Sequence, residues 1–138
     1  MSDRYFTAAE VDALIPRLNA LMGRAMERHR QASSFAHALN EEKERIRLSG
    51  GGLVDRREWK ARAERLDGLT IEVREAVKTI TALGGTVKDL EQGLVDFPGR
   101  LPQVAGEAPV NLCWKHGEDA VRFWHGMDEG YGQRKPLP

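Results

Sequence analysis

The residues of this chain that are best equipped for chemistry lie in its second half. Glu91, Asp96 and Glu118 are carboxylates, and His125 adds an imidazole. Carboxylate oxygens together with a neutral imidazole nitrogen suit a divalent transition metal. These side chains converge if the segments that carry them pair as neighbouring strands, since no His-x-x-x-His or Glu-x-x-His helical pattern joins them. The sequence therefore offers a candidate metal site formed by Glu91, Asp96, Glu118 and His125.

A second group of side chains around these positions could hold a small ligand. Cationic side chains can bind a small anion, and an aromatic ring can stack on a planar ligand. Cys113 is also a candidate nucleophile, with His125 or His116 as its base. The candidate ligand-binding residues are Lys88, Asp89, Cys113, Trp124 and Arg134.

The same residues have a purely structural interpretation. Glu118 can pair with Lys115 across a turn, and His125 can bond a backbone carbonyl. Most single cysteines are packed residues, and Arg134 can lock the tail onto the sheet by pairing with Asp96 or Glu118. Two hypotheses follow. The first, which the sequence favours, is a dimeric non-enzymatic scaffold or interaction protein. The second is a protein that binds a small ligand or a transition metal, and an enzyme is one version of it. In the second, the site would lie between sheet and helices.

The first half of the chain must supply the frame for these groups, and it is helical. Thr7-Ala8-Ala9-Glu10 fits a capping box, with Phe6 and Val11 spaced as a hydrophobic staple. Apolar residues then recur every three or four positions from Val11 to Ile46, which predicts one helix from about Ala8 to Leu48. Ser49-Gly50-Gly51-Gly52 should end it.

A second helix follows directly. Asp55 is a suitable cap, and Trp59, Leu66, Val73 and Ile80 form a heptad seam that Gly84-Gly85 closes. Two apolar stripes joined by a short glycine-rich turn predict a long antiparallel helical hairpin over residues 7–84.

The length of this hairpin has a consequence for assembly. At 1.5 Å per residue the helices span about 60 and 45 Å, whereas a typical strand spans only about 17–20 Å. The C-terminal sheet therefore cannot cover the distal half, around Phe35, Leu39, Ile46, Trp59 and Leu66. Exposed apolar surface of this kind marks an interface, so we predict a homodimer through the helical hairpin.

The last third of the chain predicts a small antiparallel sheet over residues 86–126 and an irregular tail over 127–138. Val87 to Phe97 has the composition of one strand with a bulge at Gly93, and Pro98 should take the chain out of the sheet into a loop over residues 99–109. Val110–Lys115 and Ala120–His125 alternate around a turn at 116–119. In this register His125 shares the helix-facing side with Leu112 and Trp114, and Trp124 takes the other side with Cys113.

Composition excludes several classes of protein. Lys plus Arg equals Asp plus Glu at 21 each, so no net field draws the chain to nucleic acid or an anionic membrane. One cysteine excludes an internal disulfide and every multi-cysteine zinc pattern. No apolar run approaches a membrane span and the N-terminus lacks a signal-peptide core, so we expect a single cytoplasmic domain over residues 1–138.

Several short segments of this chain form a recognisable set: Tyr5-Phe6-Thr7 with Glu10 and Leu14-Ile15-Pro16, residues 88–98, Leu112-Cys113-Trp114 with Gly117-Glu118, Trp124-His125-Gly126, Gly130-Tyr131 and Arg134-Lys135-Pro136-Leu137. Together they resemble a bacterial family catalogued as domain of unknown function 2203. The resemblance covers nearly the whole chain, and it implies that the matching polar and aromatic positions gather on the sheet and the tail. It implies no activity. The predicted fold class is α+β: a long antiparallel helical hairpin packed against a small C-terminal antiparallel sheet.

Overall fold

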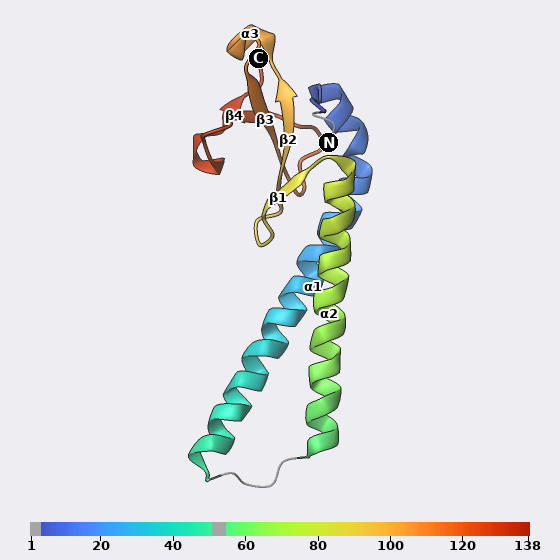
Figure 1. Cartoon of the computed structure of the whole chain (residues 1–138), viewed down its shortest axis with the longest axis vertical. Helices are drawn as coiled ribbons and strands as arrows, with labels where there is room; N and C mark the ends of the chain where they lie inside the picture. Colours follow the sequence, from blue (N-terminus) through green and yellow to red (C-terminus); the bar gives the residue numbers. More distant parts are fainter. Residues whose placement is uncertain (1–3, 51–54) are drawn as a thin grey trace.

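The computed structural model describes residues 4–50 and 55–138. Two long helices, α1 (Ala8–Leu48) and α2 (Arg56–Leu83), form an antiparallel hairpin, and a five-stranded sheet stands at the end where α1 begins and α2 ends (Figure 1). The predicted α+β fold class is confirmed.

Local sequence signals set the ends of both helices. The Thr7 hydroxyl accepts a hydrogen bond from the Glu10 amide at 3.1 Å, and the Glu10 carboxylate accepts one from the Thr7 amide at 3.0 Å. Asp55 caps α2, and Gly84 ends it in the left-handed conformation with φ 109°. The predicted helix boundaries are thus confirmed, although Gly51 and Gly52 of the predicted turn lie outside the described residues.

The core lies between the proximal part of the hairpin and one face of the sheet. Leu18 and Met22 of α1 and Ile80 of α2 are fully buried against alternate sheet residues such as Phe97 and Trp114. Burying a large apolar side chain contributes roughly 1.5–3 kcal/mol. This end of the molecule therefore holds most of the apolar stabilisation of the fold.

All neighbouring strands of the sheet are antiparallel, in the order β1-β2-β3-β4-β5. A short helix, α3, separates β2 from β3, and a 3-10 turn, η1, precedes β5. Their bounds are β1 Thr86–Asp89, β2 Leu94–Arg100, α3 Pro102–Ala105, β3 Pro109–Lys115, β4 Phe123–Gly126, η1 Tyr131–Gln133 and β5 Lys135–Pro136.

The prediction of a single strand from Val87 to Phe97 is wrong. This segment is a hairpin, in which β1 and β2 pair on either side of a turn at residues 90–93. Gly93 is not a bulge within a strand: it closes the turn with φ 74°, and its amide donates to the Asp89 carbonyl at 2.9 Å. The irregularity in the pairing lies instead between Val87 and Asp89.

The chain also stays in the sheet through Pro98, contrary to the prediction. The Pro98 carbonyl accepts from the Phe6 amide at 2.8 Å, on the edge of β2 that faces away from β3. In a strand the backbone nitrogen and the carbonyl oxygen of one residue point to the same edge. The nitrogen of Pro98 therefore points away from β3, and its lack of a proton removes no hydrogen bond between β2 and β3. β2 therefore runs on to Arg100, and the predicted loop over 99–109 contains α3.

The predicted facing of β4 is reversed. Leu112 pairs with Trp124, and Asn111 pairs with His125. Directly paired residues share a face, so Trp124 lies on the helix-facing side and His125 on the outer side with Cys113. A wide connection over residues 116–122, in place of a tight turn, allows this shift. The predicted irregular tail also contains order, because η1 and β5 lie within it.

The distal part of the hairpin has no sheet against it. Within α1 and α2, both fully described, no residue beyond Ala25 in α1 or before Leu69 in α2 is buried. Phe35, Leu39 and Trp59 are only half-buried there. Among residues 4–50 and 55–138, no helix has the length and apolar character needed to cross a membrane.

Candidate functional site

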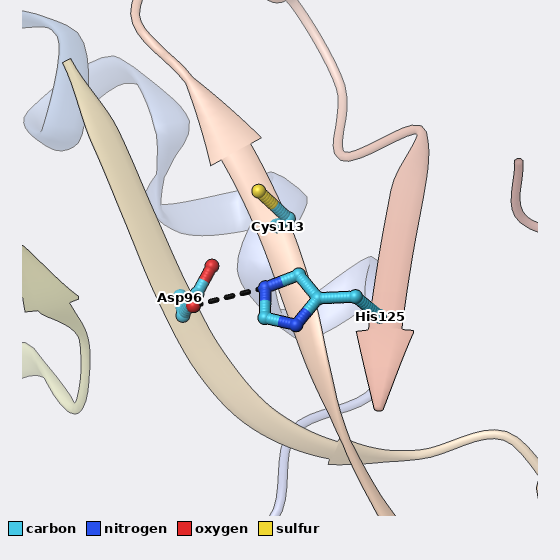
Figure 2. A group of neighbouring side chains, drawn as sticks. All are labelled: Asp96, Cys113 and His125. Atoms are coloured by element: carbon cyan, nitrogen blue, oxygen red, sulfur yellow. Dashed lines mark hydrogen bonds and ion pairs between the residues drawn. The ribbon is translucent and has the colours of Figure 1, made fainter. Parts of the chain in front are cut away.

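Three adjacent strands bring an acid, a thiol and an imidazole together on the outer face of the sheet. Asp96 of β2 pairs directly with Cys113 of β3, and His125 of β4 pairs with Asn111, two residues before Cys113. Strand alternation turns their neighbours Val95, Leu112 and Trp124 to the helix-facing side. One ligand atom from each of Asp96, Cys113 and His125 lies within 4.8 Å of the others, and all three residues are buried (Figure 2).

The His125 ring is held at both nitrogens. Nε2 lies 3.0 Å from Asp96 Oδ2, and Nδ1 lies 3.0 Å from the Gly126 carbonyl oxygen. A carbonyl oxygen only accepts, so Nδ1 carries a proton and donates it to Gly126. The side chains of His125 and Asp96 are only 3 % and 5 % exposed. The ring orientation is therefore fixed, with Nε2 directed at the carboxylate.

The Cys113 thiol is protonated in this environment. Burial, and then the nearby Asp96 charge, raises its pKa from 9.0 to about 12, and Arg134 offsets this only in part. Reactive cysteines need an electropositive, partly exposed setting that lowers the pKa. The surroundings of Cys113 are the opposite, so they disfavour the nucleophile hypothesis. A bound metal ion would supply the missing positive charge and deprotonate the thiol.

Two residues of the tail, Glu129 and Lys135, fix the backbone next to His125. The Glu129 Oε1 atom accepts from the Gly126 amide at 2.7 Å and also pairs with Lys135. These two bonds lower the pKa of Glu129, the Lys135 contact more than the amide. Glu129 thus holds the backbone of Gly126 through its amide, and the carbonyl of the same residue accepts from Nδ1 of His125. Such outer contacts commonly orient a metal-binding histidine.

A pocket of about 280 Å³ opens over the Asp96, Cys113 and His125 cluster. Its floor is the outer face of β2, β3 and β4. The β1–β2 turn and the segment after β4 form its walls. The lining residues are Lys88, Asp89, Gln92, Leu94, Asp96, Asn111, Cys113, His125, Met127, Glu129, Gly130 and Tyr131.

The four residues predicted as metal ligands divide into two groups. Asp96 and His125 are in contact, as the prediction requires. Glu91 is exposed on the β1–β2 turn, and Glu118 accepts from Arg134 at 2.9 Å and from the Lys115 amide at 2.7 Å. Neither Glu91 nor Glu118 belongs to the buried cluster. The cluster also lies on the outer face, not between sheet and helices as predicted.

The predicted ligand-binding residues divide similarly. Lys88, Asp89 and Cys113 line the pocket. Trp124 lies on the other side of the sheet, with Lys135 Nζ 4.5 Å from its ring centroid. Arg134 stacks on Phe123 at 4.0 Å and binds Glu118, so it locks the tail as the structural interpretation expected.

Asn111 and Glu129 were not predicted as site residues, and Tyr131 was named only within the resembling segment Gly130-Tyr131. A usable signal existed for Asn111, because it is the one polar residue in the apolar run from Val110 to Trp114. Alternation then places it beside Cys113. Glu129 carries no comparable signal, since its position depends on how the tail folds back over the sheet.

A family model described as "Uncharacterized conserved protein (DUF2203)" matches residues 4–137, and the chain belongs to this family. Comparisons with curated proteins and with solved structures gave no match.

Proposed function

We propose that this protein binds a divalent transition metal through Asp96, Cys113 and His125, and accepts a small ligand at the metal's remaining position. The observation that carries the proposal is the convergence of three different metal-binding side chains within 4.8 Å, all buried. Carboxylate, thiolate and imidazole are each ligands of Zn²⁺, which makes zinc the best match.

The arrangement around the cluster supports a metal site more than a purely structural pair. With Nδ1 bonded to the Gly126 carbonyl, His125 offers Nε2, the nitrogen that faces Asp96 and Cys113. A zinc site with three protein ligands keeps one position for water or another ligand. Here that position would face the pocket of about 280 Å³. Metal binding through Cys113 also needs a reduced thiol, which fits the predicted cytoplasmic location.

Cobalt titration of the metal-free protein tests this proposal. We expect one equivalent of Co²⁺ to give d–d absorption of a tetrahedral or five-coordinate site, together with a thiolate charge-transfer band. Zn²⁺ should remove both. Cys113→Ser should lose the charge-transfer band while keeping its fold by circular dichroism. Glu91→Gln, a carboxylate change outside the cluster, is the matched control and should behave like the wild type.

The proposal fails if the wild-type protein takes up neither metal at micromolar concentrations, or if Cys113→Ser gives the wild-type cobalt spectrum. The first outcome leaves Asp96 and His125 as a structural pair, and the second shows that the bound metal does not use Cys113 as a ligand.

A homodimeric scaffold is the second candidate function. It is supported by the distal hairpin, where residues 29–48 of α1 and 56–68 of α2 include no buried side chain. At roughly 1.5 Å per residue these stretches are about 30 Å and about 20 Å long. A pocket of about 620 Å³ opens there, lined mainly by α1 residues such as Phe35 and Leu39. Helices of this length gain their stability from packing of an apolar face, so a second copy would complete a four-helix bundle.

Light scattering at micromolar concentration tests the scaffold hypothesis. We expect a dimer mass for the wild type and a monomer mass for Leu39→Glu. Ala9→Glu, an exposed change near the sheet, is the control and should remain dimeric. A monomeric wild type would rule out this assembly without affecting the metal proposal.

A further inference from the structure

The pocket above the cluster contains acids that are already bonded and donors that are not. Asp89 accepts from the Gln92 amide at 2.9 Å and from its side chain at 3.1 Å. Glu129 is held by Gly126 and Lys135. In contrast, the Lys88 ammonium, the Asn111 side-chain amide and the Tyr131 hydroxyl line the pocket without a hydrogen-bond partner among residues 4–50 and 55–138. Of these unpaired groups the Lys88 ammonium can only donate, whereas the Asn111 amide and the Tyr131 hydroxyl can donate or accept, so all three can donate to an anion.

On this basis, and resting on the proposed metal site, we propose that the open metal position binds a small carboxylate, with its charge facing Lys88. A carboxylate is an acceptor-only group when ionised, so it complements the unpaired donors. Its oxygen is also a regular zinc ligand, at about 2.0–2.2 Å.

The charge of the pocket favours a single negative charge over phosphate. Lys88 is the only cation among the described residues that line it. The guanidinium of Arg134 does not line the pocket. It lies beside it, 3.4 Å from the Cys113 carbonyl oxygen, and is already bound to Glu118 and stacked on Phe123. A phosphate monoester carries about −1.5 to −2 charges near pH 7 and is usually held by several cations.

The metal centre itself would not repel such an anion. The charges of the Asp96 carboxylate and the Cys113 thiolate balance a divalent ion, so the centre is neutral before the ligand arrives. The pocket volume of about 280 Å³ corresponds to roughly nine water molecules at about 30 Å³ each. A small organic acid fits this space.

Calorimetry on the zinc-loaded full-length protein tests the inference, with glycolate as the probe and glycolamide as its uncharged counterpart. We expect glycolate to bind and glycolamide to bind at least tenfold more weakly. In the cobalt-loaded protein, glycolate should shift the d–d spectrum, which shows that it enters the coordination sphere. Inorganic phosphate should bind more weakly than glycolate.

Variants of Lys88 sharpen this test. Lys88→Met keeps the aliphatic stem and should weaken glycolate binding roughly five- to tenfold, within the range for losing one hydrogen bond from an exposed side chain. Lys88→Arg should restore most of it. Lys78→Met, an exposed lysine on α2, should have no effect.

The outcomes separate the two proposals. A wild-type protein that binds no metal refutes the proposed function. A metal-loaded protein that binds glycolamide as well as glycolate, prefers phosphate, or shows no change with Lys88→Met overturns the carboxylate inference and leaves the metal site standing.

Discussion

Breaking the Asp96–His125 pair should destabilise the metal-free protein strongly. Both side chains are nearly inaccessible, at 5 % and 3 % exposure, and their Oδ2 and Nε2 atoms are 3.0 Å apart. His125→Ala leaves a buried carboxylate without its partner, which typically costs about 3–5 kcal/mol. Asp96→Ala should cost less, because a neutral imidazole can keep its Nδ1 bond to Gly126.

The expected change in melting temperature follows from the size of the chain. An unfolding entropy of about 2.1 cal/mol/K per residue gives roughly 0.3 kcal/mol/K for 138 residues. A loss of about 3–5 kcal/mol in His125→Ala then lowers the melting temperature by roughly 10–17 °C. The double variant Asp96→Ala/His125→Ala should lose less than the sum of the single variants, by about 0.5–3 kcal/mol, since no charge is stranded.

Urea unfolding of the four proteins in chelator, followed by circular dichroism, measures this cycle. Glu91→Ala is the control, and as an exposed change it should stay within about 0.5 kcal/mol of the wild type. If the single variants each cost under about 1 kcal/mol and their effects add, the pair is not a buried electrostatic unit. The reasoning about its geometry would then be wrong.

Three further predictions concern the support of the site, its thiol and the sheet. Glu129→Ala should weaken zinc binding roughly 10–100-fold by releasing the peptide that orients His125, and Glu129→Gln should recover much of it, as measured by competition with a chromophoric chelator; equal affinities would exclude this positioning role. Cys113, with a pKa of about 12 against an ordinary 9.0, has about 1000-fold less thiolate at pH 8 than an unfolded cysteine. Iodoacetamide should therefore alkylate the native metal-free protein far more slowly than the urea-unfolded protein, with the native rate rising toward pH 12, and similar rates would contradict the burial argument. Gly99→Ala should destabilise by roughly 1–3 kcal/mol, because its Cβ would lie 2.7 Å from the Phe6 carbonyl oxygen, and an unchanged urea midpoint would show that this contact relaxes.

The helical half could be predicted from sequence because its determinants are local. The Thr7–Glu10 capping box, the Asp55 cap and the glycine after α2 each act within one turn of helix. The apolar period spans many turns, so single irregular positions do not obscure it. The resemblance to the family adds no geometry to this part.

The sheet was predicted less well because its register depends on contacts distant in sequence. A shift by one residue turns every side chain of a strand to the opposite face. The alternation in Ala120–His125 fixed the two faces of that strand but not which face meets the helices. The wide connection from Lys115 to Phe123 determines which face of β4 meets the helices, and the composition of that connection does not predict its conformation. Gly93 is a similar case, since the same glycine suits a bulge or a turn with positive φ.

The sequence named all three residues of the cluster, but it divided them between two predicted sites and added residues that lie elsewhere. Asp96 and His125 were placed together correctly, although by a register that was wrong for His125. Cys113 was assigned to ligand binding and lies within the cluster, because β2 and β3 pair it directly with Asp96. Glu91 and Glu118 were chosen for their type, and each lies on a turn where solvent or Arg134 satisfies it.

The position of the cluster on the outer face has a physical reason that also argues for a function. The helix-facing side of the sheet already carries the apolar core, with Val95, Leu112 and Trp114 fully buried. The outer face needs no further polar burial for stability, and buried ionic groups are weak stabilisers that apolar residues often replace without loss. Burying an acid, a thiol and an imidazole beneath an open pocket therefore makes the fold less stable than apolar residues at the same positions would. Local conflicts of this kind are expected at functional sites, and this one lies where a ligand can reach it.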